Sequence, residues 1–306
     1  MMSAVSEIQS LDEIQYKSRF KIILLVLLVV IIFLFSFTQF YPVGDKIKSI
    51  LKASFQGRVC NPDFDEIRME WLFPKIIISD LVIPSSCLDR QGPPLKFTHL
   101  TINYQLINFA PFGLPFKIET ELGGQPLSLY YVAGLGQQFV RLKDQSINLI
   151  RIQPLLGDDF KLAGTVLVDM SMGLSKGLMN SLSLRAQSKD LKIPPQNIQG
   201  FTTPSLKIND FYLEAESENP PRIQIQKLVL GNTESPIRAN FKGRLTLVEG
   251  NFSMSPADLV GEIAFSEQLK KSIPIIDMMF QSFNQKDGFY QVKLGGTMGS
   301  LKPINL

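Results

Sequence analysis

The stretch IRANFKGRLTL, residues 237–247, alternates between apolar and polar positions along its whole length. Alternation with a period of two places apolar side chains on one face of a β-strand and polar side chains on the other. Strands with one apolar face and one wettable face are typical of antiparallel sheets. The stretch therefore predicts an antiparallel strand whose apolar face must be buried.

The same alternation recurs along the chain, and turn residues separate the segments: Gly123-Gly124, Gly157-Asp158, Pro194-Pro195, Pro220-Pro221, Gly231-Asn232 and Gly250-Asn251. Further strands are predicted at residues 66–73, 75–83, 99–106, 116–122, 162–170, 182–186, 205–215, 222–230, 258–265 and 289–295. Helices are predicted only at 45–54, 175–180 and 267–284, the last broken by Pro274.

So few helices cannot cover this many one-sided strands. Their apolar faces must therefore meet a second sheet, or one long sheet must curl on itself. A curled sheet can leave an apolar groove. The expected fold class is mainly β, a curled, antiparallel, multi-stranded sheet domain with few short helices behind an N-terminal transmembrane helix.

That helix is predicted at residues 22–41, IILLVLLVVIIFLFSFTQFY, which contain no charged residue. Twenty helical residues measure about 30 Å, the thickness of the hydrocarbon core of a bilayer. A cleaved signal peptide is the alternative, but its apolar core is shorter and ends in small residues, whereas this run ends in Phe40 and Tyr41. We expect a retained single-pass anchor.

The orientation of the anchor follows from size, because lysine and arginine flank both of its ends. A short N-terminus stays inside easily, and large domains translocate largely regardless of charge. The expected organisation is a cytoplasmic N-terminus at residues 1–21, the transmembrane helix at 22–41, and a β-rich domain outside the cytoplasm at 42–306.

Composition and motifs point away from catalysis and from nucleic acid. The net charge of +3 is spread thinly, without the dense basic stripe that nucleic-acid binding requires. His99 is the single histidine and occupies a polar position of an alternating segment. Asp158-Asp159 fits a polar turn, and Glu214, Glu216 and Glu218 fit a solvated strand end better than a cation site. We expect no enzymatic activity, no metal and no cofactor.

The two cysteines, Cys60 and Cys87, are a candidate disulfide. If 66–73 and 75–83 form a hairpin that turns at Phe73-Pro74, Cys60 and Cys87 lie opposite each other at its open end. A disulfide requires an oxidising compartment, which agrees with a domain outside the cytoplasm.

The C-terminal third carries distinctive phrases. The tail FYQVKLGGTMGSLKPINL, residues 289–306, resembles the closing strand of AsmA-like bacterial envelope proteins, with Gly296-Thr297, Leu301 and Pro303 matching its phrase. The order of segments along the chain resembles that of the protein N (GspN) family of the bacterial type II secretion system. The segments are the N-terminal anchor, the many alternating strands, residues 241–265 and this closing strand.

The resemblance implies a non-enzymatic protein anchored in the bacterial inner membrane, with a periplasmic β-domain that binds proteins of the type II secretion machinery. It supplies no catalytic residues. The alternative is an AsmA-like envelope protein that binds or transfers phospholipid in an apolar β-groove. A lipid carrier needs a continuous apolar face that stays open after folding, whereas a scaffold subunit does not.

Overall fold

The computed structural model describes residues 25–30, 32–33, 36, 45–46, 49, 62–70, 75–88, 94–105, 113–134, 136–153, 161–175, 178–198, 201–248 and 254–305. The chain divides into two compact units, Met1–Leu51 and Lys52–Leu306. In the first unit, Leu25–Val30 are helical with exposed side chains. Within the described ranges, no helix has the length and apolarity needed to cross a membrane, and most of the predicted anchor lies outside those ranges.

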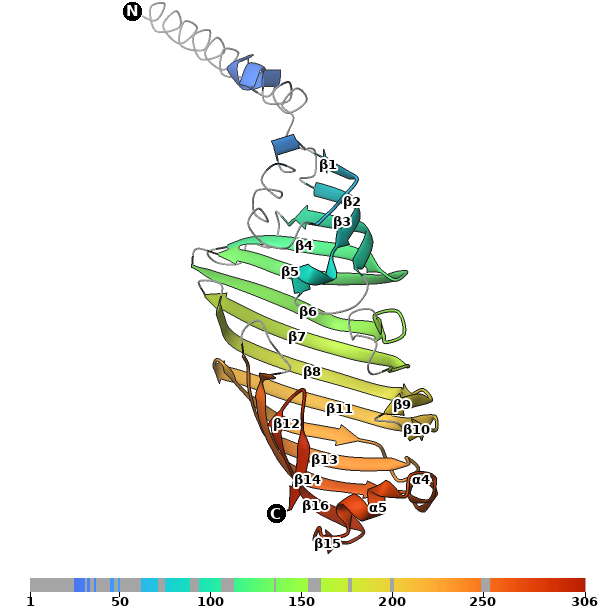
Figure 1. Ribbon diagram of the computed structural model, residues 1–306. Coiled ribbons are helices and arrows are strands. Elements are labelled where there is room, and N and C mark those ends of the chain that lie inside the picture. The colour runs from blue at the N-terminus through green and yellow to red at the C-terminus, as the bar shows by residue number, and fades with distance from the viewer. Residues whose placement is uncertain are drawn as a thin grey trace, which may run out of the picture. The chain divides into compact units, whose positions relative to one another are not determined.

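The second unit is built on one antiparallel sheet whose strands follow the order of the chain, except that β8 pairs with β11 and β14 with β16 (Figure 1). In spatial order, the strands of its main path are β1 (Glu66–Glu70), β2 (Lys75–Ile83), β3 (Leu95–Tyr104), β4 (Gly113–Leu122), β5 (Gln125–Gly134), β6 (Gln137–Asn148), β7 (Thr165–Ser175), β8 (Leu178–Ile193), β11 (Leu206–Asn219), β12 (Arg222–Leu230), β13 (Ile237–Thr246), β14 (Pro256–Phe265) and β16 (Phe289–Thr297).

The remaining elements are short. β15 (Gln285–Lys286) and β17 (Lys302–Asn305) both pair with β16, so the described part of the sheet has fifteen strands. β9 (Gln196–Ile198) and β10 (Phe201–Thr203) form a separate hairpin between β8 and β11. The helices named in this unit are the 3-10 helix η1 (Ser85–Leu88) and the α-helices α4 (Glu267–Ser272) and α5 (Ile275–Phe280).

The mainly β, antiparallel fold predicted from the sequence is confirmed. The predicted strands at 75–83 and 222–230 coincide with β2 and β12, and Pro274 separates α4 from α5. The helix predicted at 175–180 is wrong, because Ser175 ends β7 and Leu178 begins β8. β5 and β6 were not predicted.

The register of the β1–β2 hairpin differs from the prediction. Glu66 pairs with Ser79 and Glu70 with Lys75, and the bridge between Asp63 and Val82 continues the same register. This pairing is shifted by two residues from the one that set Cys60 directly opposite Cys87. The side chains of both cysteines lie outside the described residues, so their disulfide stays a prediction.

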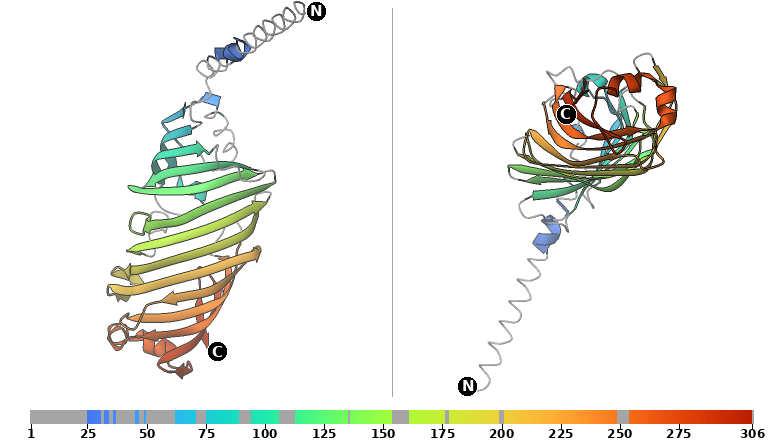
Figure 2. Two further views of the ribbon diagram at one scale, coloured as in Figure 1. Left: turned by 180° about the vertical axis from the view of Figure 1, so that it is seen from behind. Right: turned by 90° about the horizontal axis from the view of Figure 1, so that it is seen from below.

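The sheet curves because several strands contain bulges. Asp144 in β6 and Asn209 in β11 have positive φ angles of 45° and 60°, and the pairing register shifts at both sites. A bulge adds a residue to one strand, which bends that strand and increases its twist. Seen from below, the strands curve toward one side, and α4 and α5 lie on that side (Figure 2).

The two helices cover the inner side of the C-terminal strands. Leu269 of α4 is 3% exposed and packs in one cluster with Val166, Ala186 and Ile208. Phe280 of α5 packs with buried residues of β13, β14 and β16. Ser266 caps α4 by accepting a hydrogen bond from the backbone N–H of Leu269, 3.2 Å away. Two of the three buried hydrophobic clusters of this unit therefore include residues of these helices.

Candidate functional site

One face of the sheet is apolar from β1 to β16. Cross-strand pairing joins Met69 to Ile76, Ile76 to Ile102, Ile102 to Ile118, and Ile118 to Leu129, across the first five strands. Tyr131 opposite Val140 carries the row onto β6. Because side chains directly opposite each other share a face, these residues form a continuous surface.

The same surface continues into the second half of the sheet. Leu142 pairs with Met170, Met170 with Leu184, and Leu184 with Ala215. Beyond these strands, pairing reaches Leu259 and Leu294 through Ile225 and Gly243. The apolar face is defined here by Met69, Ile76, Ile102, Ile118, Leu129, Tyr131, Val140, Leu142, Met170, Leu184, Ala215, Ile225, Leu259 and Leu294.

The opposite face carries the charges. Lys117 and Glu119 form an ion pair at 2.6 Å, Arg185 and Glu214 one at 3.1 Å, and Lys293 and Asp258 one at 3.0 Å. The hydrogen bond from Lys117 to Glu119 raises the pKa of that lysine. These pairs keep the outer face wettable, so the two faces of the curved sheet differ sharply in polarity.

The two halves of the apolar face differ in what covers them. In the C-terminal half, residues of β7 to β16 belong to three hydrophobic clusters, two of which include residues of α4 and α5. In the N-terminal half, Ile76, Ile102, Ile118 and Leu129 are only partly buried and belong to none of these clusters. Among the described elements, β2 to β5 make their extensive contacts only with neighbouring strands. No hydrophobic cluster of the described residues covers these four side chains, so we call this the open half of the apolar face, although Ile78 and Leu122 on the same face are buried.

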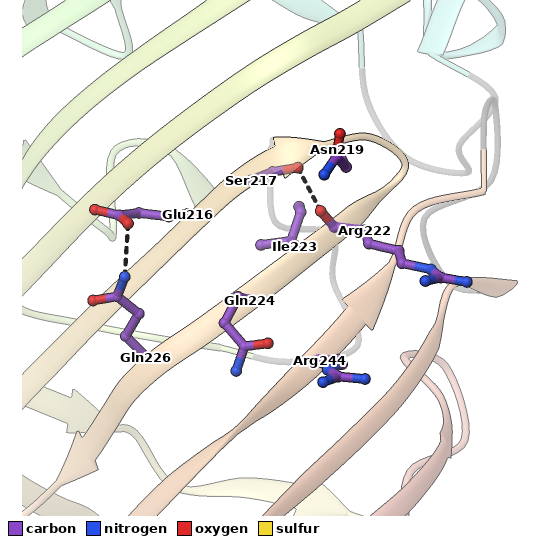
Figure 3. Close-up of a pocket in the computed structure, with 8 residues that line it drawn as sticks. All are labelled: Glu216, Ser217, Asn219, Arg222, Ile223, Gln224, Gln226 and Arg244. Carbon is purple, nitrogen blue, oxygen red and sulfur yellow. Dashed lines mark hydrogen bonds between the residues drawn. The ribbon is translucent and has the colours of Figure 1, made fainter.

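A polar pocket of about 440 Å³ opens at the turn between β11 and β12 (Figure 3). Within it, Gln226 Nε2 donates to Glu216 Oε2 at 2.6 Å, and Ser217 Oγ donates to the carbonyl of Arg222. Arg222 and Arg244 extend from the neighbouring strands β12 and β13. The residues that line this pocket place no nucleophile beside a base, so the pocket suggests no reaction.

The residues singled out from the sequence are dispersed. His99 is exposed on β3, as predicted, and its carbonyl accepts a hydrogen bond from Thr120 Oγ1 at 2.9 Å. Glu214 is engaged by Arg185, and Glu216 by Gln226. No group of three His, Cys, Asp or Glu residues arranged to hold a metal occurs in the described ranges. Asp158, Asp159 and Cys60 lie outside those ranges, and Cys87 lies in η1 with only its backbone described.

From the sequence, a curled sheet can leave an apolar groove, but the strands β5 and β6 of the apolar face were not predicted. β5 and β6 carry Leu129, Tyr131, Val140 and Leu142 on the apolar face, and their alternation is present in the sequence. It is obscured because the outer face of the same strands also carries apolar side chains, among them Tyr130, Val132 and Phe139. Only the pairing between strands shows which of these apolar residues lie on the apolar face and which lie on the outer face.

Comparisons of the chain with protein-family models, with curated proteins and with solved structures find no significant match.

Proposed function

We propose that this protein binds the acyl chains of membrane lipids on the apolar face of its curled sheet, and that a helix at residues 22–41 anchors it in the bacterial inner membrane with the β-domain in the periplasm. The observation that carries the proposal is the row of paired apolar residues that crosses the sheet from β1 to β16, whose members on β2 to β5 are only partly buried and belong to none of the hydrophobic clusters. A large apolar surface that remains partly accessible to solvent is typical of a binding site.

The dimensions of the face suit an extended hydrocarbon chain. From β1 to β16 the sheet contains thirteen strands in sequence, and neighbouring strands lie about 4.8 Å apart, so the face is roughly 55–60 Å long. Each methylene that is fully removed from water contributes about 0.8 kcal/mol, so a chain of about sixteen carbons gains on the order of 10 kcal/mol before the entropic costs of binding. The curvature of the sheet adds contacts on both sides of such a chain.

A protein partner is the second candidate function, and the resemblance to the GspN family favours it. The two phrases that carry the resemblance lie side by side, because β13, β14, β16 and β17 are consecutive neighbours at the C-terminal end of the sheet. Gly296 of the closing phrase has a φ of 122°, and a Cβ there would lie 2.7 Å from the carbonyl oxygen of Ser300. In this proposal the C-terminal end of the sheet binds a subunit of the type II secretion machinery.

Native mass spectrometry of the full-length protein tests the lipid proposal. We expect phospholipid to remain bound to the protein after its release from detergent. Leu129→Glu introduces a carboxylate on the open half of the apolar face and should reduce the lipid-bound fraction several-fold, because a charge buried against acyl chains is strongly disfavoured.

Tyr130→Glu is the matched control. Tyr130 is the next residue of β5, points to the outer face, and lies between Lys117 and Arg141 on the neighbouring strands, which favour an introduced carboxylate. This variant should retain the lipid. Equal lipid loss in both variants, or no lipid on the unmodified protein, would contradict the proposal. In the latter case, crosslinking to secretion-machinery proteins would favour the second candidate.

A further inference from the structure

A second apolar feature lies in the covered half of the sheet. It is a cavity of about 390 Å³ lined by nine residues, all of them apolar. The lining residues are Leu149, Leu162, Val166, Leu191, Ile193, Ile208, Phe211, Leu230 and Ile237. Four of these belong to the buried core beside Leu269 of α4. This cavity is therefore bordered by the packed core, unlike the open half of the apolar face.

The cavity is too large to be a packing imperfection. Protein interiors contain few voids larger than a water molecule, and unfilled volume destabilises a fold in proportion to its size. A dry cavity of about 150 Å³ lined by leucine, isoleucine and phenylalanine binds benzene. A cavity more than twice as large, with a similar lining, is expected where an apolar ligand supplies the missing contacts.

We propose that this cavity holds the terminal part of a single hydrocarbon chain whose lipid lies on the apolar face. The lining offers no hydroxyl, amide or charged side chain, whereas binding pockets usually place a few polar groups to orient a polar ligand. A methylene takes up roughly 30 Å³, about the share of one water molecule in the liquid, so the cavity accommodates on the order of ten methylene groups. The part of the ligand that enters is thus uniformly apolar.

The cavity joins the apolar face along β7. Val166 lines the cavity, Val168 follows two residues later on the same face, and Met170 comes next. Met170 pairs with Leu142 of β6 and Leu184 of β8, which belong to the apolar face. A chain that leaves the cavity along β7 therefore stays on apolar side chains. This inference rests on the proposed function, and it specifies where the methyl end of one acyl chain binds.

Photocrosslinking of the full-length protein in its membrane tests the inference. The probes are two sixteen-carbon fatty acids, one with a diazirine at the methyl end and one with a diazirine beside the carboxyl group. We expect the methyl-end probe to label peptides of β7, β8 and β11, and the carboxyl-end probe to label residues outside the cavity. Peptide mass mapping locates each label.

A cavity-filling substitution sharpens the test. Val166→Phe places a ring in the cavity and should lower methyl-end labelling there roughly tenfold, because the ring takes the space of two or three methylenes. Ile193→Phe, from β8, should act in the same way. Val229→Phe makes the same chemical change as Val166→Phe on the outer face of β12 and should leave labelling unchanged. Thermal unfolding checks that each variant is folded.

The outcomes separate the two proposals. Labelling by the methyl-end probe that is confined to the open half, at Ile102 or Ile118, would overturn the cavity assignment and keep the lipid-binding face. Labelling of neither region would overturn both. If both filling variants fail to fold, the positions labelled by the two probes on the unmodified protein still decide the cavity assignment.

Discussion

Arg185 and Glu214 face each other across β8 and β11, with 3.1 Å between Nη2 of the arginine and Oε1 of the glutamate. The hydroxyl of Tyr212 donates to the other carboxylate oxygen at 2.9 Å. Hydrogen bonds from Arg185 and Tyr212 to the ionised carboxylate lower the pKa of Glu214 from its usual value of 4.5. The outer face of the sheet is thus held by directional polar contacts, whereas most side chains of the inner face are apolar.

The Glu214 contacts predict a pH-dependent difference between the unmodified protein and Glu214→Gln. Because the folded-state pKa lies below 4.5, the carboxylate stabilises the fold above that pH, and the contribution is lost as the pH falls through the lowered folded-state pKa. The unmodified protein should unfold at a slightly higher temperature at neutral pH, and the difference should vanish under acid conditions. A difference that grows on acidification would contradict the assignment. Thermal unfolding followed by circular dichroism measures it.

Gly231 should tolerate no side chain. It turns the chain between β12 and β13 with a φ of 73°, and a Cβ there would collide with the carbonyl oxygen of Ile237. Gly136 has a φ of 82°, and a Cβ there would meet no atom within 4 Å, so it isolates the cost of the backbone conformation. Gly136→Ala should cost about 1 kcal/mol and Gly231→Ala about 3 kcal/mol of unfolding free energy. Equal costs in urea denaturation would show that the collision is relieved.

The disulfide between Cys60 and Cys87 remains a prediction, although the hairpin register that suggested it differs from the observed one. In the observed register, the two cysteines are not directly opposite each other. Cys60 nevertheless comes three residues before Asp63, and Cys87 five residues after Val82, and the bridge between these two residues marks the open end of the hairpin. Peptide mapping without reductant should find one linked pair in protein from an oxidising compartment. Two free thiols, or Cα atoms more than about 7 Å apart, would exclude the bond.

The proposed anchor predicts a topology. A reporter that is active only in the periplasm should be active when fused after Leu306, because the β-domain follows a single span and large domains translocate largely regardless of charge. The same fusion with a reporter that works only in the cytoplasm should be inactive. Activity of the cytoplasmic reporter would place the β-domain in the cytoplasm. A disulfide at Cys60 would then not be expected, because the cytoplasm is reducing.

Local alternation was enough to predict the chemistry of most strands. In β13 the apolar and polar side chains alternate along the whole strand, so it showed its two faces without reference to its neighbours. Pro274 likewise divides the C-terminal helical segment, because proline cannot continue a helix through its own position. Alternation was insufficient for β5 and β6, where both faces carry apolar residues and only pairing shows which face is which.

Residue order alone predicts one-sided antiparallel strands in this protein, because a side-chain period of two is visible among neighbouring residues. The remaining features depend on long-range contacts. The register between strands aligned the apolar residues on one face, and bulges at Asp144 and Asn209 accompanied its curvature. The core cluster that includes Leu269 of α4 also contains residues that line the cavity beside Val166. These features depend on residues far apart in the chain, whose relative positions no local pattern specifies.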